Sequence, residues 1–69
     1  QKKSRVDNLR LREYASINSK IITNLNRGTI VSVLNVVKKV DVINGQKGNW
    51  VFVKTENDYF GYCFDVYLE

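Results

Sequence analysis

Short runs of β-branched and aromatic residues, separated by polar turns, occupy most of the chain. Residues 29–36 (TIVSVLNV) alternate between two faces, as a half-buried β-strand does. Residues 40–43 (VDVI), 50–55 (WVFVKT) and 59–64 (YFGYCF) are further runs of the same kind. No stretch has the period of an amphipathic helix, so the chain is predicted to be all-β.

Turn signals separate these runs. Residues 27–28 (RG) precede the first run, residues 56–58 (END) precede the last, and residues 44–49 (NGQKGN) indicate a tight hairpin. Residues 38–39 (KK) are expected to form a solvated turn between two valine runs. Gly61 interrupts the last strand, where it predicts a bulge or the close approach of another backbone.

The remaining segments are more polar. Residues 1–8 are expected to be a basic linker or tail, and residues 12–24 a long loop with some extended structure. Residues 65–68 are expected to form one turn of 3₁₀ helix. About five short strands within one domain, residues 9–69, predict a sandwich or a barrel, and closure into a barrel best protects the strand edges. The side chains expected in the core are Leu11, Leu25, Val31, Val33, Val51, Val53, Cys63 and Leu68.

The composition excludes several classes of function. The 69 residues are 43% hydrophobic and 26% charged, which is typical of a globular domain, and no apolar run is as long as a membrane-spanning helix. The single Cys63 excludes an internal disulfide, and the absence of histidine excludes the usual zinc sites and every triad that needs an imidazole. Cys63 is expected to be a buried, unreactive thiol. We therefore expect no enzyme activity, metal or cofactor. Because the chain begins with Gln1 and contains no Met, we expect a fragment of a longer protein.

The net charge of +4 is concentrated at the N-terminus. Residues 1–12 carry five basic side chains and one acidic side chain, whereas residues 13–69 carry six of each. A basic arm of this kind could contact phosphate or an anionic surface, or act as a solubilising linker. The neutral body argues against a face for nucleic acid, which is therefore not an expected partner.

Three segments, in this order, resemble the bacterial SH3-like (SH3b) domain. Residues 9–25 (LRLREYASINSKIITNL) are similar to the family's opening L-x-V-R-x-x-P-S…S-x-V-I…L, and residues 28–34 (GTIVSVL) match G-T-x-V-x-V-L. Residues 50–68 contain WVFVK, GYC and YL, which is similar to W-x-K-V…G-W-V…Y-L. The resemblance implies a small SH3-like barrel of about five to seven short strands. Here residues 40–48 lengthen one link and are expected to form an extended hairpin insertion.

The resemblance further implies a non-catalytic binding module, of a kind often attached to cell-wall hydrolases or envelope proteins. Some members bind peptidoglycan peptides in an aromatic groove, where an extended peptide stacks on rigid rings. The extended hairpin is placed to reshape or cover one edge of such a groove. The expected groove residues are Tyr14, Trp50, Tyr62, Tyr67 and Phe52. Their alternative role is to cap the barrel or pack on the hairpin.

Carboxylates near the groove are candidates for polar contacts with a ligand amine. These candidates are Glu13, Asp58 and Asp65, and the alternative is that each is a solvated turn carboxylate.

Two functions remain open. The first is a binding module of the cell envelope, periplasmic or extracellular, that recognises peptidoglycan peptide or another short extended peptide. The second is protein–protein assembly, in which the barrel edge and the valine-rich hairpin pack on another domain or a partner. Exposed rings in an open groove would favour the first function, and a large apolar patch on the hairpin would favour the second.

Overall fold

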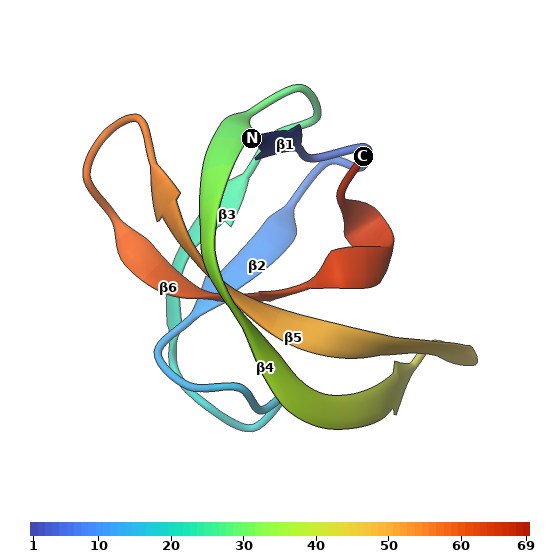
Figure 1. The fold of residues 1–69 in the computed structure, drawn as a ribbon. Helices are drawn as coiled ribbons and strands as arrows, with labels where there is room; N and C mark the ends of the chain where they lie inside the picture. Colours follow the sequence, from blue (N-terminus) through green and yellow to red (C-terminus); the bar gives the residue numbers. More distant parts are fainter.

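One antiparallel sheet of six strands, curled on itself into a small barrel, forms the fold in the computed structural model, which describes residues 1–69 (Figure 1). The strand order is β1-β4-β5-β6-β2-β3. The prediction of an all-β barrel is therefore confirmed. The elements are β1 (Lys2–Lys3), β2 (Leu9–Arg12), β3 (Ile21–Leu25), β4 (Ile30–Ile43), β5 (Gln46–Thr55), β6 (Phe60–Phe64) and the 3₁₀ helix η1 (Asp65–Tyr67). No helix of the fold is long and apolar enough to cross a bilayer.

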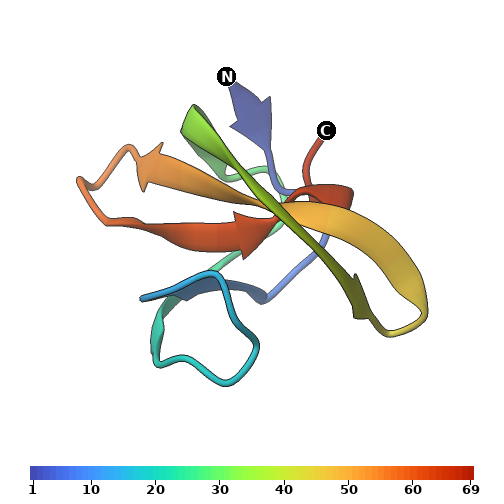
Figure 2. The same ribbon diagram turned by 60° about the horizontal axis from the view of Figure 1, so that its bottom comes forward.

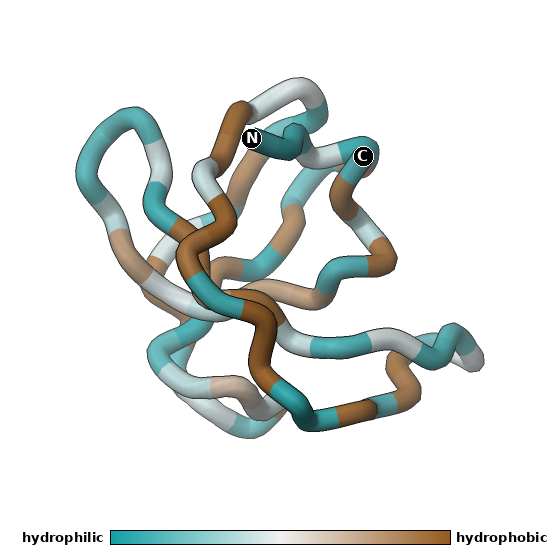
Figure 3. Tube along the Cα trace, viewed as in Figure 1, coloured by the Kyte–Doolittle hydropathy of each residue, from teal (hydrophilic) through white to brown (hydrophobic).

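The predicted hairpin is present and is longer than the strand pattern alone suggests. It joins β4 to β5 through Asn44 (φ 52°) and Gly45 (φ 77°), the two positive φ angles that a tight two-residue turn requires. Figure 2 shows this hairpin extending away from the rest of the sheet. Along the chain its hydrophobic residues alternate with polar ones (Figure 3).

The expected turn at residues 38–39 is wrong. The two valine runs belong to the single strand β4, in which Val37 pairs with Trp50 and Val40 pairs with Asn49. Residues 38–39 lie between these pairs as a bulge, so they interrupt the ladder of hydrogen bonds without reversing the chain. A pair of lysines carries no signal that distinguishes a bulge from a turn.

The N-terminal segment is part of the barrel, which departs from the linker expected over residues 1–8. Strand β1 pairs with the start of β4, and Ser4 is buried. Lys3 N–H donates to the Glu69 carbonyl at 3.0 Å, and Glu69 N–H donates back to the Lys3 carbonyl at 2.8 Å. The two ends of the chain consequently lie side by side (Figure 1). Apart from Ser4 and Val6 the side chains of this segment are exposed, while its backbone is paired with β4 and with the C-terminus, and an alternating hydrophobic pattern cannot show such pairing.

The core forms where the predicted inward side chains meet. Six of the eight expected residues are buried, and Val33 and Leu68 are partly buried against them. Leu9 joins this cluster, and the larger rings of Trp50 and Phe64 are buried as well. The six confirmed core residues are Leu11, Leu25, Val31, Val51, Val53 and Cys63.

Gly61 allows β2 to pass close to β6, as the sequence predicts. A Cβ at this position would lie 2.8 Å from the carbonyl oxygen of Arg12 and 2.8 Å from Cγ of Leu11. The two strands pair next to this point, at Arg12 and Tyr62. The long polar segment expected over residues 12–24 is a loop at residues 13–20 followed by β3.

Candidate binding groove

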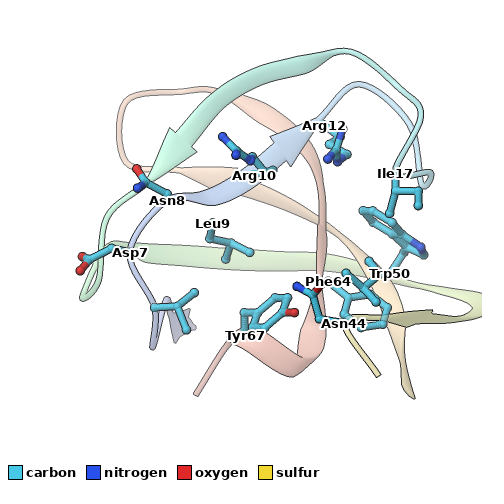
Figure 4. Close-up of a pocket in the computed structure, with 12 residues that line it drawn as sticks. Asp7, Asn8, Leu9, Arg10, Arg12, Ile17, Asn44, Trp50, Phe64 and Tyr67 are labelled. Carbon is cyan, nitrogen blue, oxygen red and sulfur yellow. The ribbon is translucent and has the colours of Figure 1, made fainter. Parts of the chain in front are cut away.

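A pocket of about 410 Å³ lies between β2, the loop at residues 13–20, the tip of the β4–β5 hairpin and η1 (Figure 4). We call it the groove. Its apolar wall is formed by Tyr67, which is half-buried, and by the buried side chains of Leu9, Trp50 and Phe64, and Ile17 projects from the loop near Trp50. The polar residues that line it are Asp7, Asn8, Arg10, Arg12 and Asn44. A cavity of this volume with a mixed lining can hold a short segment of peptide.

Trp50 belongs to the wall of the groove but presents almost no surface, because only 1% of it is exposed. Its indole N–H donates to Oδ2 of Asp41 at 3.2 Å. Its ring meets Phe64 edge to face, with centroids 5.7 Å apart. The expectation of an open stacking ring at Trp50 is therefore wrong. The physical reason is the hairpin, which brings Asp41 onto the indole edge.

Tyr67 lies where a ligand could reach it. It is half-buried on η1, its ring centroid is 6.1 Å from that of Phe64, and it lines the groove opposite β2 (Figure 4). Of the five aromatic residues expected in a groove, Trp50 and Tyr67 line this pocket, and Tyr67 has the more accessible side chain.

Tyr14 does not line the groove, although it is in the adjoining loop and 64% exposed. Ile17 from the same loop takes that place and is 49% exposed. Ser19 holds the loop closed, since its Oγ lies 2.9 Å from the Tyr14 carbonyl oxygen and accepts the Tyr14 N–H at 3.3 Å. Glu13 is exposed and also lies outside the lining.

Phe52 and Tyr62 form a second aromatic cluster outside the groove. Their ring centroids are 4.9 Å apart, and Phe60 stacks on Phe52 at 6.2 Å. The family resemblance implies both as groove residues, together with Trp50. The Phe52–Tyr62 pair lies two residues along the strands from the Trp50–Phe64 pair, which is a distance of about 7 Å. Because the sheet twists over that distance, the two pairs do not share one surface.

Asp58 and Asp65, which were expected to contact a ligand, instead bind groups of the protein itself. Asp58 pairs with Lys54 at 3.3 Å between Oδ1 and Nζ, and Oδ1 of Asp65 accepts the Asn49 N–H at 3.0 Å. Neither carboxylate lines the groove. Asp58 stands in the turn after β5, and Asp65 fastens the start of η1 to the hairpin.

The charged residues of the groove were missed by the sequence reasoning. Arg10 and Arg12 stand two residues apart on β2, so they share one face of that strand, and this spacing was the available signal. Asp7 contributes a carboxylate whose Oδ1 accepts the Arg27 N–H at 3.1 Å. The groove therefore combines an apolar wall with a polar rim on which positive charge exceeds negative charge.

Cys63 has no role in the groove. It is buried in the core, and burial, with a smaller contribution from the charge of Asp65, raises the pKa of its thiol to about 12. The expectation of a buried thiol is confirmed. A protonated thiol without access to solvent is a poor nucleophile.

Comparison with known proteins gives one match. The sequence model of the bacterial SH3 domain matches residues 7–69. Searches of curated proteins and of solved structures found no match.

Proposed function

Because this chain belongs to the bacterial SH3 domain family, a family of binding domains, we propose that it is a non-catalytic module of the bacterial cell envelope, periplasmic or extracellular. In this proposal the groove takes up a peptidoglycan peptide or another short extended peptide. The observation that carries the proposal is the groove itself, in which exposed Ile17 and half-buried Tyr67 flank the wall formed by Trp50.

The groove suits an extended chain for two reasons. Its wall is already ordered, because the Asp41 carboxylate and the Phe64 ring hold the Trp50 indole before any ligand arrives. Its polar rim offers side chains that can fix the direction of a peptide, while its apolar surface accepts a side chain. Ordering a site in advance lowers the entropic cost of binding. A module of this kind acts by raising the local concentration of whatever domain is attached to it.

Retention on insoluble peptidoglycan tests the proposal. We expect the purified domain to sediment with peptidoglycan and Ile17→Ser to lose most of that retention, since Ile17 is an exposed loop side chain whose replacement leaves the barrel folded. Ile30→Ser is the matched control, because Ile30 is exposed on β4 and outside the groove. Absence of retention, or equal retention by the domain and both folded variants, would overturn the groove as a wall-binding site.

A second candidate function, protein–protein assembly, is favoured by a specific surface. Val36, Val40 and Val42 on β4 are 56%, 57% and 59% exposed. Strand β1 covers only residues 30–31 of the same strand, so the outer edge of β4 is open beyond them. Open edges and exposed aliphatic residues are used for docking.

Hydrogen exchange discriminates the assembly function. It would be measured at the amides of residues 36–42 in the isolated domain and in the longer protein. Slower exchange of these amides in the longer protein would support the assembly function, and equal exchange would overturn it.

A further inference from the structure

Two arginines on the rim of the groove have no acidic partner. Arg10 and Arg12 both line the groove, and neither takes part in an ion pair, since the two ion pairs of the protein are Lys3–Glu69 and Lys54–Asp58. Figure 4 shows both side chains on β2, along the side of the groove opposite Tyr67. A cation without a counter-charge beside an apolar cavity favours an anionic ligand.

Arg12 is the less exposed of the two arginines. It is half-buried, and its Nη1 donates to the Ser19 carbonyl at 2.9 Å. That bond restrains the guanidinium and commits only one of its five N–H donors. Arg10 is exposed and donates from Nη1 to Oδ1 of Asn24 at 3.2 Å, which likewise leaves donors free. Guanidinium groups held in this way match the geometry of a carboxylate.

The one carboxylate of the lining does not neutralise these cations. Asp7 is exposed, and its Oδ1 accepts the backbone N–H of Arg27. Figure 4 places Asp7 at the end of the groove away from Trp50 and Ile17, whereas Arg12 is on the Ile17 side. The most positive part of the rim thus adjoins the apolar wall, so one ligand can contact both.

Resting on the proposed function of the groove, we propose that its ligand carries a free carboxylate next to an apolar side chain. The carboxylate binds the guanidinium of Arg12, assisted by Arg10, and the side chain packs on Ile17 and Tyr67, the two lining side chains that are accessible beside the buried Trp50 ring. An acidic position or a free C-terminus in an extended peptide has this chemistry. A nucleic acid would require a cluster of basic side chains along its phosphates, whereas residues 13–69 carry six basic and six acidic side chains, so a single carboxylate suits the two arginines better.

A matched pair of small probes tests this selectivity. N-acetyl-leucine and N-acetyl-leucinamide share the apolar side chain and differ in the carboxylate. Each is titrated into the purified domain while NMR follows the Trp50 indole N–H, the Ile17 methyl groups and the Arg12 Nε–H. We expect the acid to shift all three signals and to bind about tenfold more tightly than the amide, since an ionised hydrogen-bonded pair is worth that factor or more. Inorganic phosphate at matched ionic strength should not displace the acid.

Substitutions then assign the effect to the rim. Arg12→Gln should reduce the affinity for the acid to that for the amide, and Arg10→Gln, at a more exposed position, should do so in part. Arg27→Gln is the control, because it removes the same charge from a side chain outside the lining. The comparison of acid and amide in the unaltered domain needs no variant to fold.

The outcomes separate this inference from the function on which it rests. Equal shifts with acid and amide, equal weakening by Arg27→Gln and Arg12→Gln, or displacement of the acid by phosphate would overturn the carboxylate preference and leave the groove as a binding site. Retention on peptidoglycan without any shift from the acid would also overturn the preference. Absence of both retention and groove shifts would overturn the proposed function itself.

Discussion

The carboxylate of Asp41 ties the hairpin to the wall of the groove through Trp50. Oδ2 of Asp41 accepts the indole N–H at 3.2 Å, and Oδ1 accepts the N–H of Val42 at 3.0 Å. The Asp41 side chain therefore orients the indole ring of Trp50 and also accepts a hydrogen bond from the backbone N–H of Val42 on β4. The groove and the hairpin are consequently parts of one structural unit.

Loss of this carboxylate should destabilise the protein and release the indole. We predict that Asp41→Ala lowers the free energy of unfolding by about 1–2 kcal/mol, because hydrogen bonds to a charged group are worth about that much when part-buried. Urea unfolding followed by fluorescence of the single Trp measures it. Asp58→Asn, which removes an exposed ion pair and keeps a side chain that tolerates the positive φ of this position (64°), should cost less than about 0.5 kcal/mol. Equal costs for the two variants would show that the Asp41–Trp50 bond does not stabilise the fold.

Removal of the Trp50 ring should unfold the domain rather than create a folded protein with an empty groove. We predict a cost of about 3–5 kcal/mol for Trp50→Ala, since the side chain is fully buried against Phe64. A core of this size rarely supplies more than about 3–5 kcal/mol in total. Circular dichroism should show loss of the β-sheet signal at room temperature. A native spectrum would place the ring outside the core.

The fold could be predicted from the sequence because strands and tight turns have local signatures, namely the alternation of hydrophobic and polar residues and the residues that adopt positive φ angles. Alternation of residues assigned the core positions Val31, Val51 and Val53, and the Asn44-Gly45 pair assigned the hairpin turn. The groove depends on contacts between distant segments, which alternation does not encode. The burial of Trp50 follows from Asp41 nine residues earlier in the chain, on a strand that folds back.

The arginines of the rim illustrate the same limit. The spacing of Arg10 and Arg12 places them on one face of β2, but only the packing of β2 near η1 turns that face into a side of the groove. Phe52 was assigned to the groove because it shares the strand phase of Trp50, and the twist of the sheet separates the two positions.

Substitution of Gly61 should disturb the crossing of β2 over β6. A Cβ placed there lies 2.8 Å from a backbone oxygen of Arg12, which cannot move without shifting the strand. We predict that Gly61→Ala lowers the free energy of unfolding by about 1–3 kcal/mol, as overpacking does. Gly45→Ala is a useful comparison, because it meets open space and is strained only through its positive φ, at a cost of about 1 kcal/mol. Thermal unfolding of both variants measures the difference, and a smaller loss for Gly61→Ala would contradict the close approach.

The buried thiol predicts a specific loss of stability at alkaline pH. Burial raises the pKa of Cys63 from the ordinary value of 9.0 to about 12 in the folded protein, so the unfolded chain releases the thiol proton more readily than the folded one. The contribution of the Cys63 thiol to the free energy of unfolding is fully present below about pH 9 and is lost progressively between pH 9 and pH 12. Cys63→Val removes the titration and keeps an apolar side chain of similar size. Its unfolding free energy should therefore fall less steeply from pH 9 to pH 11 than that of the unaltered protein. Parallel profiles would show that Cys63 does not contribute.

Thiol reactivity gives an independent check of the same burial. An aromatic disulfide reagent at pH 8 should modify Cys63 only at the rate of unfolding, because the thiol is fully buried and protonated in the folded protein. Addition of urea should raise the rate in step with the unfolded fraction. Rapid modification of the folded protein would mean that β6 opens locally.

Removal of residues 1–5 should destabilise the domain, although the family match begins only at residue 7. Ser4 is buried, its N–H donates to the Thr29 carbonyl at 2.9 Å, and its carbonyl accepts the Gly28 N–H at 2.7 Å. Arg5 adds a backbone bond to the Tyr67 carbonyl at 2.9 Å and a bond from Nε to the Val66 carbonyl at 2.8 Å. Truncation leaves these partners unpaired beside the core.

We predict that the truncation costs about 2–4 kcal/mol, since each lost hydrogen bond contributes about 0.5–1.5 kcal/mol. Lys3→Gln separates backbone pairing from charge, because it keeps β1 and removes only the exposed ion pair with Glu69. It should cost less than about 0.5 kcal/mol. Urea unfolding of both proteins makes the comparison. If the truncated protein is as stable as Lys3→Gln, the N-terminal segment is a tail and β1 does not stabilise the barrel. If it is much less stable, the folded unit begins before the family match, at the strand that closes the two ends of the chain together.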